Sequence, residues 1–432
     1  MRDILRTAVA AVLAVVLALV LTGVWFLTRP AVAAVAWGPQ RTVADWAWST
    51  GSSLAVTGAG GSLIVHALLS SDFVDGHFAT DHGPYEGVFL TASQDHGQSW
   101  SDPVRVSQPS KHADRGAIAA DGQHLYAVWV TRASYDHYSP SGRRVLYFRA
   151  NDAAGGVNGW ASTVRLSKTK GRVDQASVAA DGGRIYVVWT DAVSGDVRLA
   201  LSADGGKTWK RSVLGKAKAS DPTGEGRVGL PTVAAAGANV GVSWLATPNG
   251  IVKARLSTDG GRAWHPPITL ASSGGAADEG SPSVAGTGDR LAFAWTTPSG
   301  VWVKTWSGGN WSAPRQVATF GANSIYSGGY DVAVALAGTD SIGVAWSACR
   351  SAGCVTSSAL TRTNLLWSQS VDGGMTWSGA SLVHGANVPD QQINDGASIA
   401  WLDPSTRLLL YGGSVSGLTT YRLYSRVGSG AP

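Results

Sequence analysis

The sequence has little charge and contains few cysteines and methionines. Charged residues make up 15% of the chain, no run of lysine or arginine is present, and there are two cysteines and two methionines in 432 residues. Proteins that bind nucleic acid meet the phosphates with a basic patch or stripe. This chain has none, so nucleic-acid binding is excluded as a function class.

The N-terminal segment contains a long uncharged run. Arg2 and Arg6 precede an apolar stretch over residues 7–28, which is long enough to span a bilayer as a helix. Two Ala-x-Ala patterns, at 31–33 and 34–36, match the pattern that signal peptidase reads, and no cysteine follows that could carry a lipid. We expect residues 1–36 to be a cleaved signal peptide or a retained signal anchor. Residues 37–432 would then be secreted, or anchored in the cell membrane and exposed outside the cytoplasm.

The two cysteines lie close together, at Cys349 and Cys354. Because no pair of histidines accompanies them, they make a poor metal site. In an oxidising compartment, this spacing predicts a disulfide within one loop.

Glycine and tryptophan are abundant instead, with 55 and 19 copies, and many of them fall in a repeat. Four octets share one pattern: SQDHGQSW at 93–100, SADGGKTW at 202–209, STDGGRAW at 257–264 and SVDGGMTW at 370–377. The aspartate can accept backbone N–H groups of a tight turn, glycine supplies positive φ, and tryptophan buries a large ring. The four aspartates are Asp95, Asp204, Asp259 and Asp372. Weaker copies lie at 151–160 and 305–311, where the aspartate is lost.

Two further strands recur around each octet. Seven segments of small residues, at 53–58, 116–121, 176–181, 231–237, 282–288, 331–338 and 397–403, suit strands that converge on a narrow axis. Most are followed by a strand that ends in tryptophan: Trp129, Trp189, Trp244, Trp295 and Trp346. These rings could stack on sugars, but their place within strands favours packing between neighbouring sheets.

This arrangement predicts an all-β, seven-bladed β-propeller, with six blades as the alternative, preceded by one N-terminal hydrophobic helix. The last repeat ends after its third strand, near 420–427. The segment WGPQRTVA at 37–44 is similar to WSAPRQVA at 311–318. We therefore expect the N-terminal strand to complete the last blade and remove two open sheet edges.

The octets resemble the Asp-box, or bacterial neuraminidase repeat, of sialidase-like propellers. The resemblance covers nearly all of the chain after the N-terminal segment. It implies that the octets are structural turns at one end of the propeller, and that a functional site lies at the other end.

Several polar loops are expected at that other end. Loops in blades one, two and six, at 70–87, 131–144 and around the two cysteines, could form one wall of a cleft. The first holds hard oxygen and imidazole groups that suit Ca²⁺ or another metal, although solvated loops are often this polar. These metal candidates are Asp72, Asp75, His77, Asp81, His82 and Glu86. No other cofactor is expected.

The connections between blades add charge near the axis. Asp114 with Arg115, Arg172 with Asp174, and Glu225 with Arg227 lie in successive blades. A guanidinium group can bind a carboxylate through two parallel hydrogen bonds, so the three arginines could bind an anionic sugar or an acidic peptide. The alternative is that these charges are paired or solvated rim residues.

The resemblance also implies a catalytic alternative. Sialidase-like enzymes use an arginine triad, a tyrosine nucleophile and a glutamate that activates it. The candidates here are Tyr326 or Tyr330 with Glu225 or Glu279. However, the Arg-Ile-Pro signature before the first octet is missing, and the enzymes have six blades.

We therefore expect a binding module for a cell-surface glycan, an anionic ligand or a protein. The alternative is an exo-α-sialidase-type glycoside hydrolase. A third option is an assembly scaffold held beside the membrane by its N-terminal helix.

Overall fold

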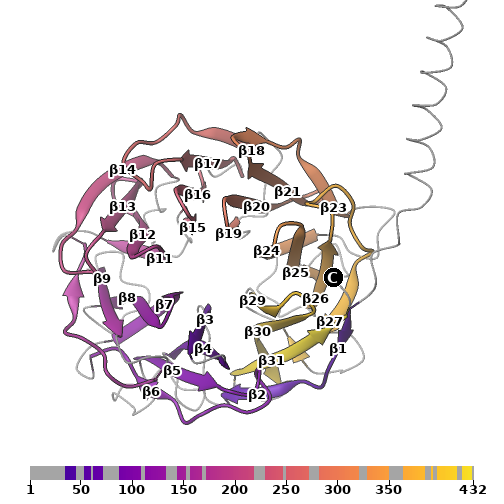
Figure 1. Cartoon of the computed structure of the whole chain (residues 1–432), viewed down its shortest axis with the longest axis horizontal. Coiled ribbons are helices and arrows are strands. Elements are labelled where there is room, and N and C mark those ends of the chain that lie inside the picture. The colour runs from indigo at the N-terminus through magenta and orange to yellow at the C-terminus, as the bar shows by residue number, and fades with distance from the viewer. Residues whose placement is uncertain are drawn as a thin grey trace, which may run out of the picture.

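The protein forms a ring of seven β-sheets around a central axis (Figure 1). The computed structural model describes residues 35–44, 53–59, 62–71, 87–108, 112–132, 144–151, 156–167, 172–217, 229–246, 250–271, 282–320, 328–349, 363–384, 391–392, 397–415 and 421–430. Across these ranges the secondary structure is all β, and no helix in them could cross a membrane. The expected helix at the N-terminus lies outside them. The predicted seven-bladed propeller is confirmed.

Each sheet is one blade, and blades 1 to 7 follow the order of the chain. Blades 1 to 4 are each four-stranded. Their strands are β3 (Ser53–Ala59), β4 (Ser62–Ser71), β5 (Gly87–Ser93), β6 (Val104–Arg105); β7 (His112–Asp121), β8 (His124–Arg132), β9 (Arg144–Asn151), β10 (Val164–Arg165); β11 (Val173–Asp181), β12 (Arg184–Asp191), β13 (Asp196–Ser202), β14 (Lys210–Lys216); and β15 (Thr232–Ala236), β16 (Asn239–Leu245), β17 (Val252–Ser257), β18 (Ile268–Ala271).

Blade 6 keeps this four-stranded plan, and blades 5 and 7 vary it. In blade 5, two short outer strands pair with β21, and in blade 7 strands from both ends of the chain meet. The strands are β19 (Ser283–Thr287), β20 (Arg290–Thr297), β21 (Gly300–Ser307), β22 (Asn310–Trp311), β23 (Arg315–Thr319); β24 (Gly328–Ala337), β25 (Ser341–Cys349), β26 (Thr363–Ser370), β27 (Ser381–His384); and β28 (Gln391–Gln392), β29 (Ser398–Asp403), β30 (Thr406–Val415), β31 (Tyr421–Ser429) with β1 (Ala36–Trp37) and β2 (Arg41–Ala44).

The N-terminal strand closes the ring as predicted. Strand β1 pairs antiparallel with β31 through Ala36 and Ser429, and β2 continues along β31 from Arg41 opposite Ser425 (Figure 1). The pairing covers the outer edge of β31, which would otherwise present free backbone groups. Trp37 packs edge-on against Trp367 of blade 6, with ring centroids 5.6 Å apart, so the closing strand also joins two blades.

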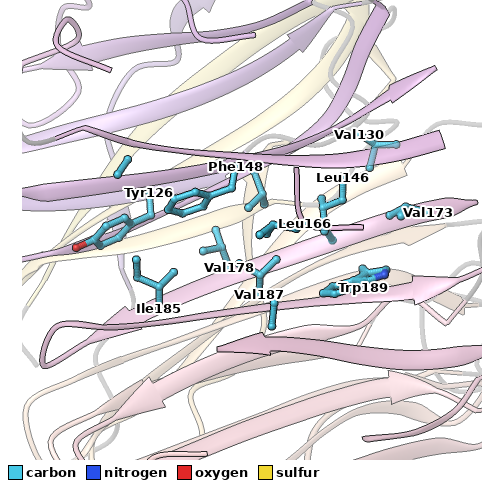
Figure 2. Packing of buried hydrophobic residues seen from close by; sticks show 14 residues of the cluster. Tyr126, Val130, Leu146, Phe148, Leu166, Val173, Val178, Ile185, Val187 and Trp189 are labelled. Atoms are coloured by element: carbon cyan, nitrogen blue, oxygen red, sulfur yellow. The ribbon is translucent and has the colours of Figure 1, made fainter. Parts of the chain in front are cut away.

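The core lies between neighbouring blades. One cluster joins blades 2 and 3, with Tyr126 and Ile185 at one end and Val173 and Trp189 at the other (Figure 2). All five tryptophans at the ends of second strands are at most 3% exposed. Their burial confirms the prediction that they pack between blades, where each such side chain contributes on the order of 2 kcal/mol.

A series of hydroxyl groups joins the inner strands around the axis. The Ser53 hydroxyl of blade 1, for example, accepts the Ile118 N–H of blade 2 at 3.2 Å. Ser177, Ser283 and Ser398 accept N–H groups of the next inner strand in the same way, from Val233, Val334 and Leu54. In blade 4 the direction is reversed, and the Thr232 hydroxyl donates to the Pro282 carbonyl just before β19. These residues are small enough to fit beside the axis and also satisfy backbone groups of the neighbouring blade.

Candidate functional site

The four octets form tight turns between the third and fourth strands of blades 1, 3, 4 and 6. In the second octet, Asp204 accepts hydrogen bonds from the N–H groups of Lys207 (3.1 Å) and Thr208 (2.9 Å) and from the Thr208 hydroxyl (2.5 Å). Ser202 donates to Asp204 at 2.7 Å and accepts the Gly206 N–H at 2.9 Å. The serine that opens the octet is therefore as much a part of the turn as the aspartate, a role that the sequence analysis missed.

These hydrogen bonds stabilise the ionised carboxylates. The hydroxyl and the N–H of Thr208 lower the pKa of Asp204 to about 2. For Asp95, burial acts to raise the pKa, but hydrogen bonds from the Ser99 hydroxyl and N–H outweigh it and hold the pKa at about 2. The pKa values of Asp259 and Asp372 are lowered as well. A carboxylate held in this way is a structural acceptor and a poor general acid.

The octets also pack against the preceding blade. A side chain at Gly206, whose φ is +90°, would collide with the Phe148 ring of blade 2. The octet tryptophan, Trp209, lies edge-on to the same ring with centroids 4.9 Å apart. The octet thus positions a glycine and a tryptophan between two blades.

Blades without the full octet form this turn differently. In blade 5, Gly308 and Gly309, both with positive φ, make a two-residue hairpin between β21 and β22. Positive φ at both central residues is the conformation that a two-residue hairpin turn requires. In blade 2, Asn151 donates its side-chain amide to the Gly156 carbonyl at 3.0 Å.

The hairpins between first and second strands lie at the same end of the propeller, which we call the octet face. Asp121 of blade 2 accepts the Gly183 N–H of blade 3 at 2.6 Å, and Asp181 of blade 3 accepts the Gly237 N–H of blade 4. These contacts join successive blades. The octet face is therefore built for stability.

The opposite face is defined by the connections between blades and between second and third strands. There the inner strands of blades 2, 3 and 6 each carry a β-bulge, between Asp114 and Ala117, Val173 and Ala176, and Gly329 and Val332. Counted from the tryptophan of each second strand, the bulges lie at corresponding places. The bulge spans Arg115 and Gly116 in blade 2, just after Asp114, and it spans Asp174 and Gln175 in blade 3 and Tyr330 and Asp331 in blade 6.

Arg115 has a φ of +52°, a conformation that side chains with a Cβ rarely adopt. Bulges and such backbone conformations often orient a side chain at a functional site. Arg115, Asp174 and Tyr330, which were singled out in the sequence, thus lie in bulges at corresponding places around the axis, and Asp114 lies beside the first of them.

Two of the three predicted arginines, Arg115 and Arg172, lie among the described residues. Arg172 immediately precedes β11, in register with His112 of blade 2, whereas Arg115 is in register with Gln175. The two arginines therefore lie at different levels along their inner strands, and Arg227 is outside the described residues. Whether the three bind one ligand remains a prediction.

The predicted catalytic side chains lie outside the described part of the chain. The sequence contains three glutamates, and Glu225, Glu279 and Glu86 all fall there, as does Tyr326. The backbone of Tyr330 is in β24, but its side chain is not among those described. No Tyr–Glu distance tests the catalytic alternative.

The metal and disulfide predictions also concern residues that the structure does not describe. The candidate Ca²⁺ loop with Asp72, Asp75, His77, Asp81, His82 and Glu86 falls outside the described ranges, and Cys349 ends β25 while Cys354 lies beyond them. Within the described ranges, no group of three or more metal-binding side chains comes together. Both the metal site and the disulfide stay predictions.

No protein-family model matches the chain, and no curated protein matches it. Similar solved structures include a sialidase of Trypanosoma rangeli, with 13% identity and a TM-score of 0.48 over 90% of this chain and 60% of that chain. The NanB sialidase of Streptococcus pneumoniae has 12% identity and a TM-score of 0.44 over 74% and 67%. A fungal lectin of Aleuria aurantia, a six-bladed propeller that recognises fucose, has 12% identity and a TM-score of 0.44 over 79% and 97%.

These structural neighbours are sialidase and lectin propellers, and this chain spans 60% of the Trypanosoma enzyme. Their TM-scores below 0.5 carry no argument about function. The seven-bladed architecture rests on the strand pairings of this chain.

Proposed function

We propose that the protein is an extracytoplasmic binding propeller that recognises an anionic glycan at the face opposite the octets. The observation that supports this most is the set of three bulges at corresponding places in blades 2, 3 and 6. Residues 1–36 would export the propeller, either as a cleaved signal or as a retained anchor.

The bulges place mixed polar groups around one axis. Each bulge adds a residue to its inner strand, and the side chain can then be oriented differently from one in a regular strand. Arg115 brings a guanidinium group, which is suited to a carboxylate, and Gln175 and Asp331 bring groups that can bond hydroxyls. A carboxylate surrounded by hydroxyls is the chemistry of an acidic sugar. The resemblance of the octets to the Asp-box supports carbohydrate as the ligand class.

A second candidate function is the exo-α-sialidase-type hydrolase. The observation that favours it is that the Tyr330 backbone lies in the β24 bulge, in register with Asp114 and Asp174. A tyrosine nucleophile needs a base to take its proton, because the phenol is largely neutral near pH 7. Glu225 or Glu279 would have to supply that base.

A glycan array probed with the detergent-solubilised full-length chain tests the proposal. We expect binding to acidic glycans, weakened about tenfold by Arg115→Gln, since one charge-assisted hydrogen bond contributes about 1.5–3 kcal/mol. The matched control is Arg165→Gln, which removes an exposed arginine on the outer strand of the same blade. Acidic-glycan binding that both variants retain in full would contradict the proposed site.

A fluorogenic sialoside distinguishes the two candidates. Hydrolysis by the wild-type chain that Tyr330→Phe abolishes would establish the enzyme. Binding without hydrolysis supports the binding module. Neither binding nor hydrolysis would overturn both.

A further inference from the structure

A pocket of about 400 Å³ lies at the junction between blades 2 and 3. Its floor is apolar, with Leu166 from blade 2 and Val173, Trp189 and Val213 from blade 3. Figure 2 shows Leu166, Val173 and Trp189 in the cluster that joins the two blades. Small-molecule sites commonly have this size and an apolar lining with a few polar groups.

The wall of the pocket is a turn held in place by one carboxylate. Asp191 accepts the N–H groups of Val193 (3.1 Å) and Ser194 (3.3 Å), so the turn between β12 and β13 has a fixed shape. Val193 at its tip is 71% exposed, and Val213 on β14 is 49% exposed. Two of the most exposed large apolar side chains in the described ranges therefore line one pocket, a pattern that marks interaction sites.

The carboxylates at the pocket are matched by cations. Arg198 donates to Asp196 at 2.6 Å and lies 3.6 Å from Asp191, and Lys216 binds the other oxygen of Asp196 at 2.6 Å. The Lys216 hydrogen bond lowers the pKa of Asp196. Both carboxylates therefore already have a cation beside them.

One cation in the lining remains without a carboxylate. Arg211 donates its Nε–H to the Leu166 carbonyl at 3.1 Å. No ion pair to it is found among the described residues, so its terminal N–H groups are available to a ligand. The pocket thus combines an apolar floor, a rigid wall and one uncompensated positive charge.

We propose that this pocket binds a small carboxylic acid with an apolar body, with Arg211 as the counter-ion of the carboxylate. The apolar body would lie on Leu166, Trp189 and Val213. This site is separate from the proposed glycan site, because its lining does not include Arg115, Gln175 or Asp331.

The test uses the full-length chain in detergent and three acids, phenylacetate, indoleacetate and octanoate, each paired with its uncharged amide. Saturation-transfer NMR detects binding, and calorimetry gives the Kd. We expect at least one acid to bind at least about tenfold more tightly than its amide, because the bond to Arg211 is charge-assisted. Val213→Asp should abolish binding of that acid by placing a negative charge at the pocket.

The decisive variant is Arg211→Gln, which should remove the preference for acid over amide. Its control is Arg255→Gln in blade 4. Arg255 also donates to an outer-strand carbonyl of the preceding blade, Leu214 at 2.6 Å, so both variants lose one inter-blade hydrogen bond. Arg255→Gln should leave acid binding unchanged.

Three outcomes would overturn the proposal: no acid of the panel binds at millimolar concentration, acid and amide bind equally, or Arg211→Gln keeps the preference. Arg115→Gln provides the separation from the glycan site. It should weaken glycan binding and leave acid binding intact, so the two proposals can fail independently.

Discussion

The two faces of this propeller differ in how they satisfy the backbone. On the octet face, each octet aspartate accepts several hydrogen bonds within its own turn, and Asp121 and Asp181 join successive blades. On the opposite face, three inner strands are bulged and Arg115 has positive φ. At one end, the hydrogen-bonding groups of the turns are satisfied and the turns are regular. They thus provide a rigid frame for the irregular backbone at the other end. A frame of this kind is what a binding site on loops requires.

Acid should act on the octet face with the largest effect. The pKa of Asp95 falls from its ordinary value of 3.8 to about 2 in the folded protein, and the other three octet aspartates shift in the same direction. A carboxylate with a lowered folded-state pKa adds stability above its unfolded pKa and loses it as the pH falls through the folded value. We expect cooperative unfolding between about pH 4 and pH 2, and circular dichroism measured along a pH titration would detect it.

A variant with asparagine at all four octet aspartates is the control. It should be less stable than the wild type at pH 7 and much less sensitive between pH 4 and 2. A wild-type melting temperature that stays constant from pH 5 to pH 2 would refute a structural role for the ionised octets.

A separate acid effect should come from His66 in the middle of blade 1. The side chain is fully buried, its Nε2 lies 2.9 Å from the Thr57 hydroxyl, and burial lowers its pKa from 6.5 to about 4. The folded state therefore resists protonation, and stability should decrease as the pH falls from 6.5 towards 4, by about 3 kcal/mol in total. Denaturant titrations at pH 7, 5.5 and 4 measure this loss. In His66→Gln, the free energy of unfolding should depend much less on pH above pH 4. If the variant keeps the pH dependence of the wild type, another group causes it.

The closing strand gives the next effect in size. Val35 is 8% exposed in the cluster with Trp367 and Leu409, and Ala36 pairs with Ser429. A chain that begins at Trp37 should be less stable than one that begins at Ala34 by about 2 kcal/mol, because it lacks a buried valine and one strand pair. Thermal unfolding of the two chains compares them, and equal midpoints would show that blade 7 closes without Val35.

The same burial leads us to expect that any cleavage by signal peptidase falls after Ala33 rather than after Ala36. Mass spectrometry of the secreted form would identify the terminus. A mature N-terminus at Trp37 would contradict this choice.

A single octet should contribute less. Asp372→Ala removes the acceptor of the Thr376 N–H (2.8 Å) and hydroxyl (2.6 Å), so unfolding should become easier by about 1 kcal/mol. Asp372→Asn, which keeps one oxygen acceptor, should lose less. Because this turn is on the octet face, ligand binding at the opposite face should be unchanged in both variants, and a loss of affinity without a loss of stability would reverse the roles of the two faces.

The smallest effect on stability is expected at Arg115. Glycine adopts positive φ without strain, so Arg115→Gly should change the free energy of unfolding by no more than about 0.5 kcal/mol, as the relief of strain offsets the lost contacts. Binding of acidic glycans should nevertheless weaken about tenfold. A large loss of stability in this variant would show that Arg115 has a structural role, as the octets do. The two faces would then not differ in the way described above.

The sequence predicted the fold best where a residue type has the same structural role in several repeats. The octets, the small-residue inner strands and the buried second-strand tryptophans recur along the chain, so comparison of the copies was enough to predict seven blades. The closure by 37–44 was predicted from its similarity to one such copy, at 311–318. The serine that opens each octet and the hydroxyls at Ser53, Ser177 and Ser283 are equally regular. They were overlooked because small polar residues suit a narrow axis even without a specific bond.

The candidate site was harder to predict because it depends on register. In the sequence, Arg115 and Arg172 look like counterparts, but a β-bulge adds a residue and shifts the backbone against its partner strand. The pocket with Arg211 could not be anticipated at all. It forms between strands of two blades, and nothing in the sequence near Arg211 shows that Asp191 and Asp196 are matched by other cations.

The pairing of Ala36 with Ser429 also fixes an order of events during synthesis. The strand that completes blade 7 is among the first parts of the propeller to be made, and its partner is among the last. Blades 1 to 6 can stack one after another as the chain emerges, but β2 has no partner until β31 arrives. During that interval an unpaired strand edge is exposed next to an open ring, which is the state most prone to pairing with another chain. The ring can therefore close only after the last strand of the chain has been made.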